Sequence, residues 1–202
     1  MREMIEGQPV LIVVDIQGCG QMEHPPVPHM NDGREMHANA AKLIAAARAA
    51  GIPVVFIQEA HRPDLIDFGR ELDGEETVHA LETDPKTDIS DDIGYRPGVD
   101  YFVRKRRYSA FFGTDLAILL KGLKAETLIL IGALTDVCVH YTFVDAHQND
   151  YFTRVVEDCV VGSTRAAHDA SLRAMEYLQT GARRTTAEVL AVFAGAEAAM
   201  AA

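Results

Sequence analysis

The chain has 202 residues, of which 48% are hydrophobic and 24% charged, a composition typical of a globular protein with a core of its own. Its formal net charge of −11 disfavours a general nucleic-acid-binding role, because such proteins carry a basic surface. No apolar stretch reaches membrane-spanning length, and the amino-terminal sequence MREMIEGQPVLIVVD lacks the pattern of a secretory leader. The cysteines, Cys19, Cys138 and Cys159, are odd in number and widely spaced. We therefore expect a reduced, cytoplasmic protein that binds neither nucleic acid nor membrane.

The first half of the chain predicts two strands that flank a helix. The run VLIVVD at 10–15 is continuous, apolar and β-branched, which is typical of a strand buried on both faces. A helix is expected at 37–51, where an alanine-rich stretch ends on glycine, and a second strand at 53–58. The stretch 59–99 interrupts this rhythm and is rich in Asp, Glu, Gly and Pro. Because loops of this length in a compact domain are often functional, we expect it to shape the substrate pocket.

The second half continues the alternation. Strands are predicted at 100–105, 127–133, 152–158 and about 182–186, and helices at 114–123, 138–148, 165–179 and along the alanine-rich carboxyl-terminal stretch. Thr114 is the expected cap of its helix. This order predicts an α/β fold: a three-layer, Rossmann-like, open and mainly parallel sheet with helices on both faces. We expect one domain over residues 1–202.

Three chemically different side chains follow predicted strands. Asp15 ends the first strand, Lys105 ends the third, and Cys138 follows the most apolar strand after a short turn. In an open parallel sheet, ligands bind beyond the carboxyl ends of the strands, so these groups are expected to form a nucleophilic site. Each residue alone is more often a turn residue, a surface lysine or a core cysteine. The helix beginning at Cys138 is expected to acidify the thiol through its dipole.

Three motifs carry a family resemblance: VLIVVDIQ, KRRYSAFFGTDL and LILIGALTDVCVHYTFVDA. In order and spacing they resemble the isochorismatase-like cysteine hydrolases, which include nicotinamidases, N-carbamoylsarcosine amidases and hydrolases of ureido compounds. The resemblance spans about 10–163. It implies an Asp15–Lys105–Cys138 triad and a cis peptide bond between Ala133 and Leu134. It also implies an oxyanion hole built from the N–H groups of Leu134 and Cys138.

The implied activity is hydrolysis of a C–N bond in a small amide or ureido compound. The Cys138 thiolate attacks the carbonyl, Asp15 takes the thiol proton and returns it to the leaving ammonia or amine, and water cleaves the thioester. Lys105 stabilises the negative charges. The resemblance further implies no required cofactor, a small-molecule substrate as partner and a homo-oligomer, either a dimer or a tetramer.

Departures from the family pattern leave open whether the protein binds a metal. Isochorismatases proper lack the cysteine, so Cys138 argues against vinyl-ether hydrolysis. Nicotinamidases carry an Asp-x-His pair and a later His that bind a metal, and this chain offers Glu59, His61 and His79. Carboxylate and imidazole suit zinc or a similar divalent ion, so a metal-assisted, nicotinamidase-like amidase is one alternative. Ordinary polar contacts within the loop are the plainer interpretation.

The candidate substrate-binding residues are Gln17, Arg107, Tyr108 and His140. The stretch SAFFGT at 109–114 favours carbamoylsarcosine-type and ureido-type hydrolases. His140 lies two residues after the cysteine, where some of those enzymes carry an arginine for a substrate carboxylate. Arg107 or Arg62 is the candidate replacement, although a plain surface role for Arg107 is equally compatible with the sequence.

Two functions of other classes remain open. A redox-sensing protein would use the Cys138 thiol but would not need Asp15 and Lys105 at neighbouring strand ends. A non-catalytic, flavodoxin-like binding module would release no ammonia from any amide. Under the hydrolase interpretation, Cys19 and Cys159 should tolerate alanine, because neither lies where the strand ends converge.

Overall fold

The structure is a computed structural model that describes residues 4–18, 27–31 and 33–200, so Cys19 lies outside the described residues. Its sheet has the strand order β3-β2-β1-β4-β5-β6 and every neighbouring pair is parallel. The strands are β1 Gln8–Val14, β2 Val54–Glu59, β3 Tyr101–Lys105, β4 Ala125–Ala133, β5 Phe152–Val161 and β6 Arg183–Arg184. The α-helices are α1 Arg34–Ala49, α2 Leu116–Gly122, α3 Cys138–Gln148, α4 Arg165–Leu178 and α5 Thr186–Met200.

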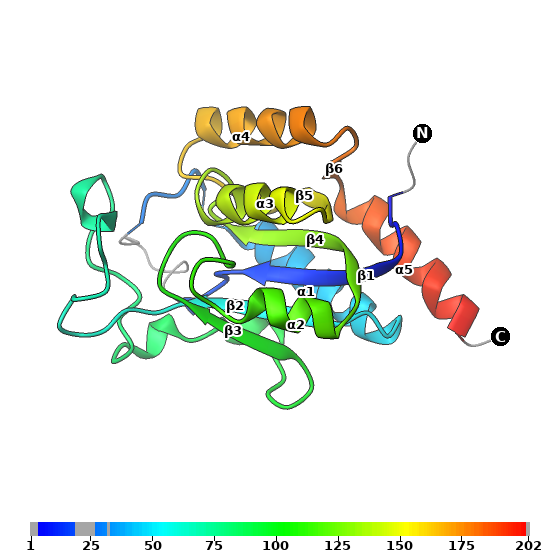
Figure 1. The fold of residues 1–202 in the computed structure, drawn as a ribbon, viewed down its shortest axis with the longest axis horizontal. Coiled ribbons are helices and arrows are strands. Elements are labelled where there is room, and N and C mark those ends of the chain that lie inside the picture. Colours follow the sequence, from blue (N-terminus) through cyan, green and yellow to red (C-terminus); the bar gives the residue numbers. More distant parts are fainter. Residues whose placement is uncertain (1–3, 19–26, 32, 201–202) are drawn as a thin grey trace.

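Helices cover both faces of the sheet, as predicted (Figure 1). One core cluster joins apolar side chains of α1 and α5 to one face, and a second joins α2, α3 and α4 to the other. The central strand β1 is buried on both faces, with 0% exposure from Val10 to Val14, because its apolar run feeds both cores. The α/β, three-layer, parallel fold is therefore confirmed. None of the described helices is both long and apolar enough to cross a membrane.

Several element boundaries differ from the prediction. Helix α2 begins at Leu116 instead of 114, with Asp115 at the cap position, while the Thr114 hydroxyl accepts the Leu116 N–H at 3.2 Å. Strand β5 continues to Val161, three residues beyond the expected end. The β4–β5 pairing is irregular between Leu130 and Gly132, after which the apolar end of β5 pairs again. The charges at Glu157 and Asp158 thus mark this irregularity and not the end of the strand.

Gly132 allows β1 and β4 to meet closely beneath the strand ends. Its φ is +118°, and a Cβ there would lie 1.9 Å from the Val14 carbonyl oxygen. Only glycine fits such an approach. The turn after β4 therefore starts directly beside the end of β1, where Asp15 follows.

The long connection from β2 to β3 folds back over the strand ends (Figure 1). It contains short 3-10 helices at Glu71–Asp73, Pro85–Thr87 and Asp91–Ile93. Isolated bridges join Gln17 to Ile89 and His61 to Leu81, which hold the connection against the end of the sheet. The irregular segment is thus placed where ligands bind in this class of fold.

Candidate active site

Four polar residues meet where the strand order reverses between β1 and β4. Asp15 follows β1, Glu59 ends β2, Lys105 ends β3 and Cys138 begins α3 after β4. Glu59 and Lys105 are direct neighbours in the β2–β3 register. Sequence reasoning brought Asp15, Lys105 and Cys138 together but placed Glu59 only among metal ligands. The signal that could have found it is its position, since β2 ends one residue later than predicted and, like β3, on a charged side chain.

Lys105 is the centre of this group and is fully buried. Its Nζ lies 2.8 Å from Asp15 Oδ2, 2.9 Å from Glu59 Oε2 and 3.4 Å from Cys138 Sγ. Burial alone would lower the pKa of Lys105, but the charges of these neighbours outweigh it and hold that pKa well above its usual value. The side chain is therefore a fixed ammonium between two carboxylates and a thiol.

The two carboxylates differ in their proton affinity. Burial raises the pKa of Asp15 to about 6, against the opposing charge of Lys105. Its contact with Lys105 is an ion pair without hydrogen-bond geometry, so neither Asp15 oxygen has a hydrogen-bond donor among the described residues. Burial would also raise the pKa of Glu59, but Lys105 and the hydrogen bonds of His61 and His79 hold it well below its usual value. Of the two carboxylates, Asp15 therefore has the higher affinity for a proton, whereas Glu59 stays ionised.

The Cys138 thiol is protonated at rest, so the expected acidification is wrong. Burial raises the pKa of this thiol well above its usual value, and the charges of Glu59 and Asp15 add to that effect while Lys105 opposes it. The thiol donates to Glu59 Oε2 at 3.7 Å, and its sulfur lies within 4.8 Å of oxygens of both carboxylates. With the pKa raised in this way, a thiolate has to be generated by transfer of the proton.

The turn before Cys138 has the geometry that the resemblance implied. The peptide bond between Ala133 and Leu134 is cis. Cys138 is the first residue of α3, where an N–H group has no acceptor within the helix. Within the described part of the chain, neither this N–H nor that of Leu134 donates a backbone hydrogen bond. Both residues line the cavity in front of the thiol, so the oxyanion hole at these two groups stays a prediction that the geometry permits.

A cavity of about 80 Å³ opens in front of these groups. Asp15, Glu59 and Cys138 line it from the strand ends. The connection from β2 to β3 contributes Glu76, His79 and Ala80, and the other walls come from Ile16, Gln17, Val27, His29, Gly33, Met36, His37, Tyr108, Ala133, Leu134, Val137 and Val161. Segment 59–99 thus lines this cavity, and its role in a substrate pocket stays a prediction.

The predicted substrate-binding residues fall into two groups, and Gln17 and Tyr108 are those in the cavity wall. The Gln17 amide donates to the Glu59 carbonyl at 2.9 Å and accepts the Glu59 N–H at 3.0 Å. Gln17 therefore positions Glu59 and has little capacity left for a substrate. The Tyr108 hydroxyl donates to Glu76 Oε2 at 3.4 Å.

His140, Arg107 and Arg62 lie outside the cavity wall. The His140 ring contacts the Tyr141 ring, and burial lowers the pKa of His140. The Arg107 guanidinium donates to the carbonyl oxygens of Asp67 and Arg106. The Arg62 side chain is 61% exposed and lies 3.8 Å from Asp67. The sequence suggested His140 as a substrate-binding residue and Arg107 or Arg62 as the partner of a substrate carboxylate, but none of the three lines the cavity.

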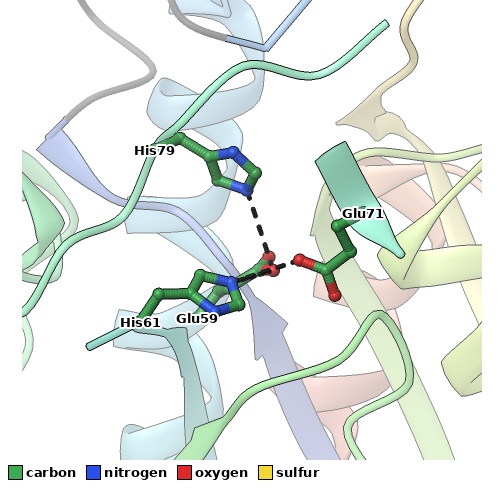
Figure 2. A group of neighbouring side chains, drawn as sticks. All are labelled: Glu59, His61, Glu71 and His79. Atoms are coloured by element: carbon green, nitrogen blue, oxygen red, sulfur yellow. Dashed lines mark hydrogen bonds and ion pairs between the residues drawn. The ribbon is translucent and has the colours of Figure 1, made fainter. Parts of the chain in front are cut away.

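A second cluster lies on the other side of Glu59 (Figure 2). Glu59, His61 and His79 come together as predicted, and Glu71 joins them; one ligand atom of each lies within 4.8 Å of all the others. His61 Nε2 is 3.2 Å from both Glu59 Oε1 and Glu71 Oε2, and His79 Nε2 is 3.8 Å from Glu59 Oε1. Sequence reasoning missed Glu71, which is one of many acidic residues in this segment and carries no distinguishing pattern.

The charges of the second cluster are balanced around His61. Burial would lower the pKa of His61, but its contacts with Glu59 and Glu71 raise it to about 9. His79 donates from Nδ1 to the Thr77 carbonyl at 2.6 Å, which leaves Nε2 facing Glu59. Both Glu71 oxygens are buried and have no hydrogen-bond partner among the described residues. This set can either share protons or hold a divalent ion.

The model of the isochorismatase domain matches residues 9–189. The chain belongs to the isochorismatase family. Among its relatives, ureidoacrylate amidohydrolase RutB from Methylorubrum extorquens strain AM1 is 34% identical over 198 residues, covering 87% of this chain and 74% of the relative. The RutB enzyme of Pseudomonas syringae pv. syringae is 32% identical over an alignment of 178 residues that covers 77% of this chain and 71% of the relative.

Solved structures agree with this assignment to the isochorismatase family. A cysteine hydrolase from Pseudomonas syringae pv. phaseolicola has a TM-score of 0.85 at 26% identity and covers 96% of this chain and 97% of that one. N-carbamoylsarcosine amidase from Thermoplasma acidophilum has a TM-score of 0.71 at 27% identity, covering 88% of this chain and 95% of that one. The family resemblance inferred from the three sequence motifs is therefore confirmed.

Proposed function

We propose that this isochorismatase-family chain is a cysteine-dependent amidohydrolase that cleaves a C–N bond in a small amide or ureido compound. The observation that carries the proposal is the contact of one buried Lys105 ammonium with both Asp15 and Cys138 beside a cavity at the strand ends. Relatives named as ureidoacrylate amidohydrolases and as N-carbamoylsarcosine amidase support it. Ammonia release from a panel of biuret, ureidoacrylate, carbamoylsarcosine, nicotinamide and maleamate would test it.

The first half-reaction forms a thioester. Asp15 accepts the Cys138 proton as the sulfur attacks the substrate carbonyl, and Lys105 remains close to the charge that develops. The N–H groups of Leu134 and Cys138 would hold the oxyanion, an effect worth about 2.7–4 kcal/mol for one donor in a comparable enzyme. The intermediate collapses when the C–N bond breaks and Asp15 returns the proton to the leaving ammonia or amine.

The second half-reaction regenerates the thiol. Asp15, again ionised, takes a proton from water as the water oxygen attacks the thioester carbonyl, and the C–S bond then breaks. The proton passes from Asp15 to the departing sulfur. An amide yields a carboxylic acid, whereas a ureido compound yields a carbamate that decomposes to an amine and carbon dioxide. The residues described suffice for this route.

We expect kcat/KM to decrease when the pH is lowered below about 6. Asp15 works as a base only when ionised, and burial raises its pKa to about 6. As pH falls through that value the carboxyl becomes protonated, and the rate should drop toward a tenfold loss per pH unit. Initial rates between pH 4.5 and 8 with a confirmed substrate check this. A profile that stays flat from pH 5 to 7 would contradict the assigned base.

A metal-assisted amidase is the second candidate, because one observation favours it. Glu71 is only 4% exposed and both its oxygens lack a hydrogen-bond partner among the described residues, so its carboxylate is aimed at a cluster that could use it. Two imidazoles and two carboxylates fit zinc or a similar divalent ion, with Glu59, His61, Glu71 and His79 as ligands. Such an ion would polarise a substrate carbonyl or bind water.

Under this candidate, Glu71→Gln should weaken zinc binding by at least about tenfold. The variant replaces one ligand and leaves the Asp15, Lys105 and Cys138 contacts unchanged. Calorimetric titration of the metal-free protein with zinc measures the affinity, and elemental analysis gives the metal content after purification. Asp64→Asn removes an exposed charge from the same segment and serves as the control. Absence of zinc binding to the unaltered protein would leave the cluster as a network of ion pairs.

The proposal includes a cytoplasmic homo-oligomer, either a dimer or a tetramer. Several apolar side chains on the outer surface of the helices are exposed, including Ile118 of α2 at 75% and Tyr177 of α4 at 88%. Exposed apolar groups of this kind mark association surfaces when they gather. Light scattering at micromolar concentration should give a multiple of the 22.1 kDa chain mass, and a mass of one chain would contradict it.

A further inference from the structure

The described wall of the active-site cavity contains three carboxylates and no lysine or arginine. Asp15, Glu59 and Glu76 line it, whereas no lysine or arginine is among the described residues of the wall. The Lys105 ammonium lies behind Asp15 and Glu59 and is in contact with both. Residues 19–26 have the sequence CGQMEHPP, so this undescribed stretch can bring no lysine or arginine either.

The neighbouring arginines are bound to other groups. Arg106 donates to the Ala60 carbonyl and to Glu82. Arg107 donates to carbonyl oxygens of segment 59–99 and of its own strand end. Arg104 donates to Gln58 and lies 3.3 Å from Glu82. The basic run RKRR thus ties the long connection to β3 and offers one buried lysine to the site, with no arginine for a substrate.

The histidines of the wall do not reverse the balance. Burial lowers the pKa of His29, with His37 adding to the effect, so His29 is neutral. His37 is paired with Asp92 at 2.9 Å. The pKa of His79 is raised by Glu59 in spite of burial, so any positive charge on His79 offsets a carboxylate that it already contacts.

Glu76 is the third carboxylate of the wall and, unlike Asp15 and Glu59, has no contact with Lys105 among the described contacts. It is half-buried, and its contact with the Tyr108 hydroxyl at 3.4 Å is a neutral one. Burial raises the pKa of Glu76; the charge of His79 opposes this rise, and the charges of Glu59 and Glu71 add to it. An outer hollow that shares Glu76 and Tyr108 with the cavity does contain Arg70. That guanidinium is 92% exposed and 3.0 Å from Asp73, so solvent and its partner screen it.

We infer that the substrate carries no carboxylate, and that its non-reacting end, which faces Glu76, is uncharged or positively charged and rich in N–H donors. This inference rests on the proposed amidohydrolase function and adds a substrate class to it. A carboxylate entering this cavity would lose its hydration without gaining a cation, which is costly. It would also meet like charges, whereas an N–H donor or an ammonium group would be attracted to Glu76.

Alkylation of Cys138 tests the charge of the cavity without any substrate. The whole protein is alkylated in EDTA with iodoacetamide or with iodoacetate, and each rate is measured as modification of the peptide that contains Cys138. The iodoacetamide rate is divided by the iodoacetate rate, and this ratio is divided by the same ratio for a neutral model thiol. We expect this quotient to exceed unity by about tenfold or more, because only iodoacetate is repelled. Glu76→Gln should reduce it several-fold and Glu76→Lys further. The matched controls Asp64→Asn and Asp64→Lys should leave it unchanged.

Turnover supplies the second arm. Three ureas with the same reacting group are compared: N-carbamoylglycine, its neutral amide and 2-aminoethylurea. The neutral and cationic compounds should be hydrolysed faster than the carboxylate, and Glu76→Lys should reverse the order. Two results would overturn the inference. One is a quotient near unity, and the other is that N-carbamoylglycine is hydrolysed fastest and that Arg70→Ala abolishes this preference. No ammonia from any compound, together with a high quotient, would contradict the proposed function and leave the charge selectivity standing.

Discussion

Replacing Cys138 by alanine is expected to abolish ammonia release while the fold remains intact. The side chain is 6% exposed and the change removes only its sulfur, so a small cavity is the structural cost. Loss of the nucleophile should lower kcat on the order of 10⁶-fold, the loss found when a hydrolase loses its nucleophilic serine. Ammonia assays with circular dichroism of the same preparation measure both effects.

Cys159→Ala is the matched control for that result. Cys159 is also a free, buried thiol, but it lies in β5, where its sulfur contacts the Met36 carbonyl oxygen at 3.5 Å. Its replacement should cost some stability and leave the rate near normal. Full activity of Cys138→Ala would contradict the mechanism and return this thiol to a packing role.

Replacing Asp15 by asparagine is expected to lower kcat/KM by about 10²–10⁴-fold, the usual contribution of general acid–base catalysis. Asparagine keeps the shape of the side chain but cannot accept a proton, and the Glu59 contact still pairs Lys105. The loss of rate below about pH 6 should also disappear, because the group that titrates there is gone. Rates of both proteins across the same pH range provide the measurement.

Glu59→Gln separates the roles of the two carboxylates. In spite of burial, Lys105 and the contacts with His61 and His79 hold the pKa of Glu59 well below its usual value, so Glu59 is a weak proton acceptor. We expect a smaller loss of rate than for Asp15→Asn, with the dependence on pH near 6 retained. The opposite order of the two variants would assign the base to Glu59, whose oxygen accepts the thiol hydrogen bond.

The sequence could predict the parts of the site that follow from strand position. Asp15 directly follows β1, Lys105 ends β3, and Cys138 follows β4 after a short turn. Parallel strands bring these ends to one edge of the sheet. Predicting the alternation of strands and helices was sufficient to predict the α/β layers, because each run has the hydrophobic pattern of either a strand or a helix. Predicting that Asp15, Lys105 and Cys138 lie together therefore needed no long-range information beyond the order of elements.

The remainder depends on distances that no local pattern encodes. Glu71 reaches His61 only because the connection from β2 to β3 folds back in short 3-10 turns. The raised pKa of Cys138 reflects burial beside Asp15 and Glu59, whereas sequence position alone suggested the influence of the helix dipole. Arg107 looked available in the sequence, yet the folded connection supplies carbonyl oxygens that bind it.

The mass of the Cys138 peptide during turnover tests the central claim most directly. With a substrate identified by ammonia release, acid quenching in the first turnovers should show that peptide carrying the acyl or carbamoyl group of the substrate. Hydroxylamine should remove the added mass, and the Cys159 peptide should remain unchanged. Steady ammonia release with an unmodified Cys138 peptide at every time point, and equal release by Cys138→Ala, would contradict the thioester mechanism.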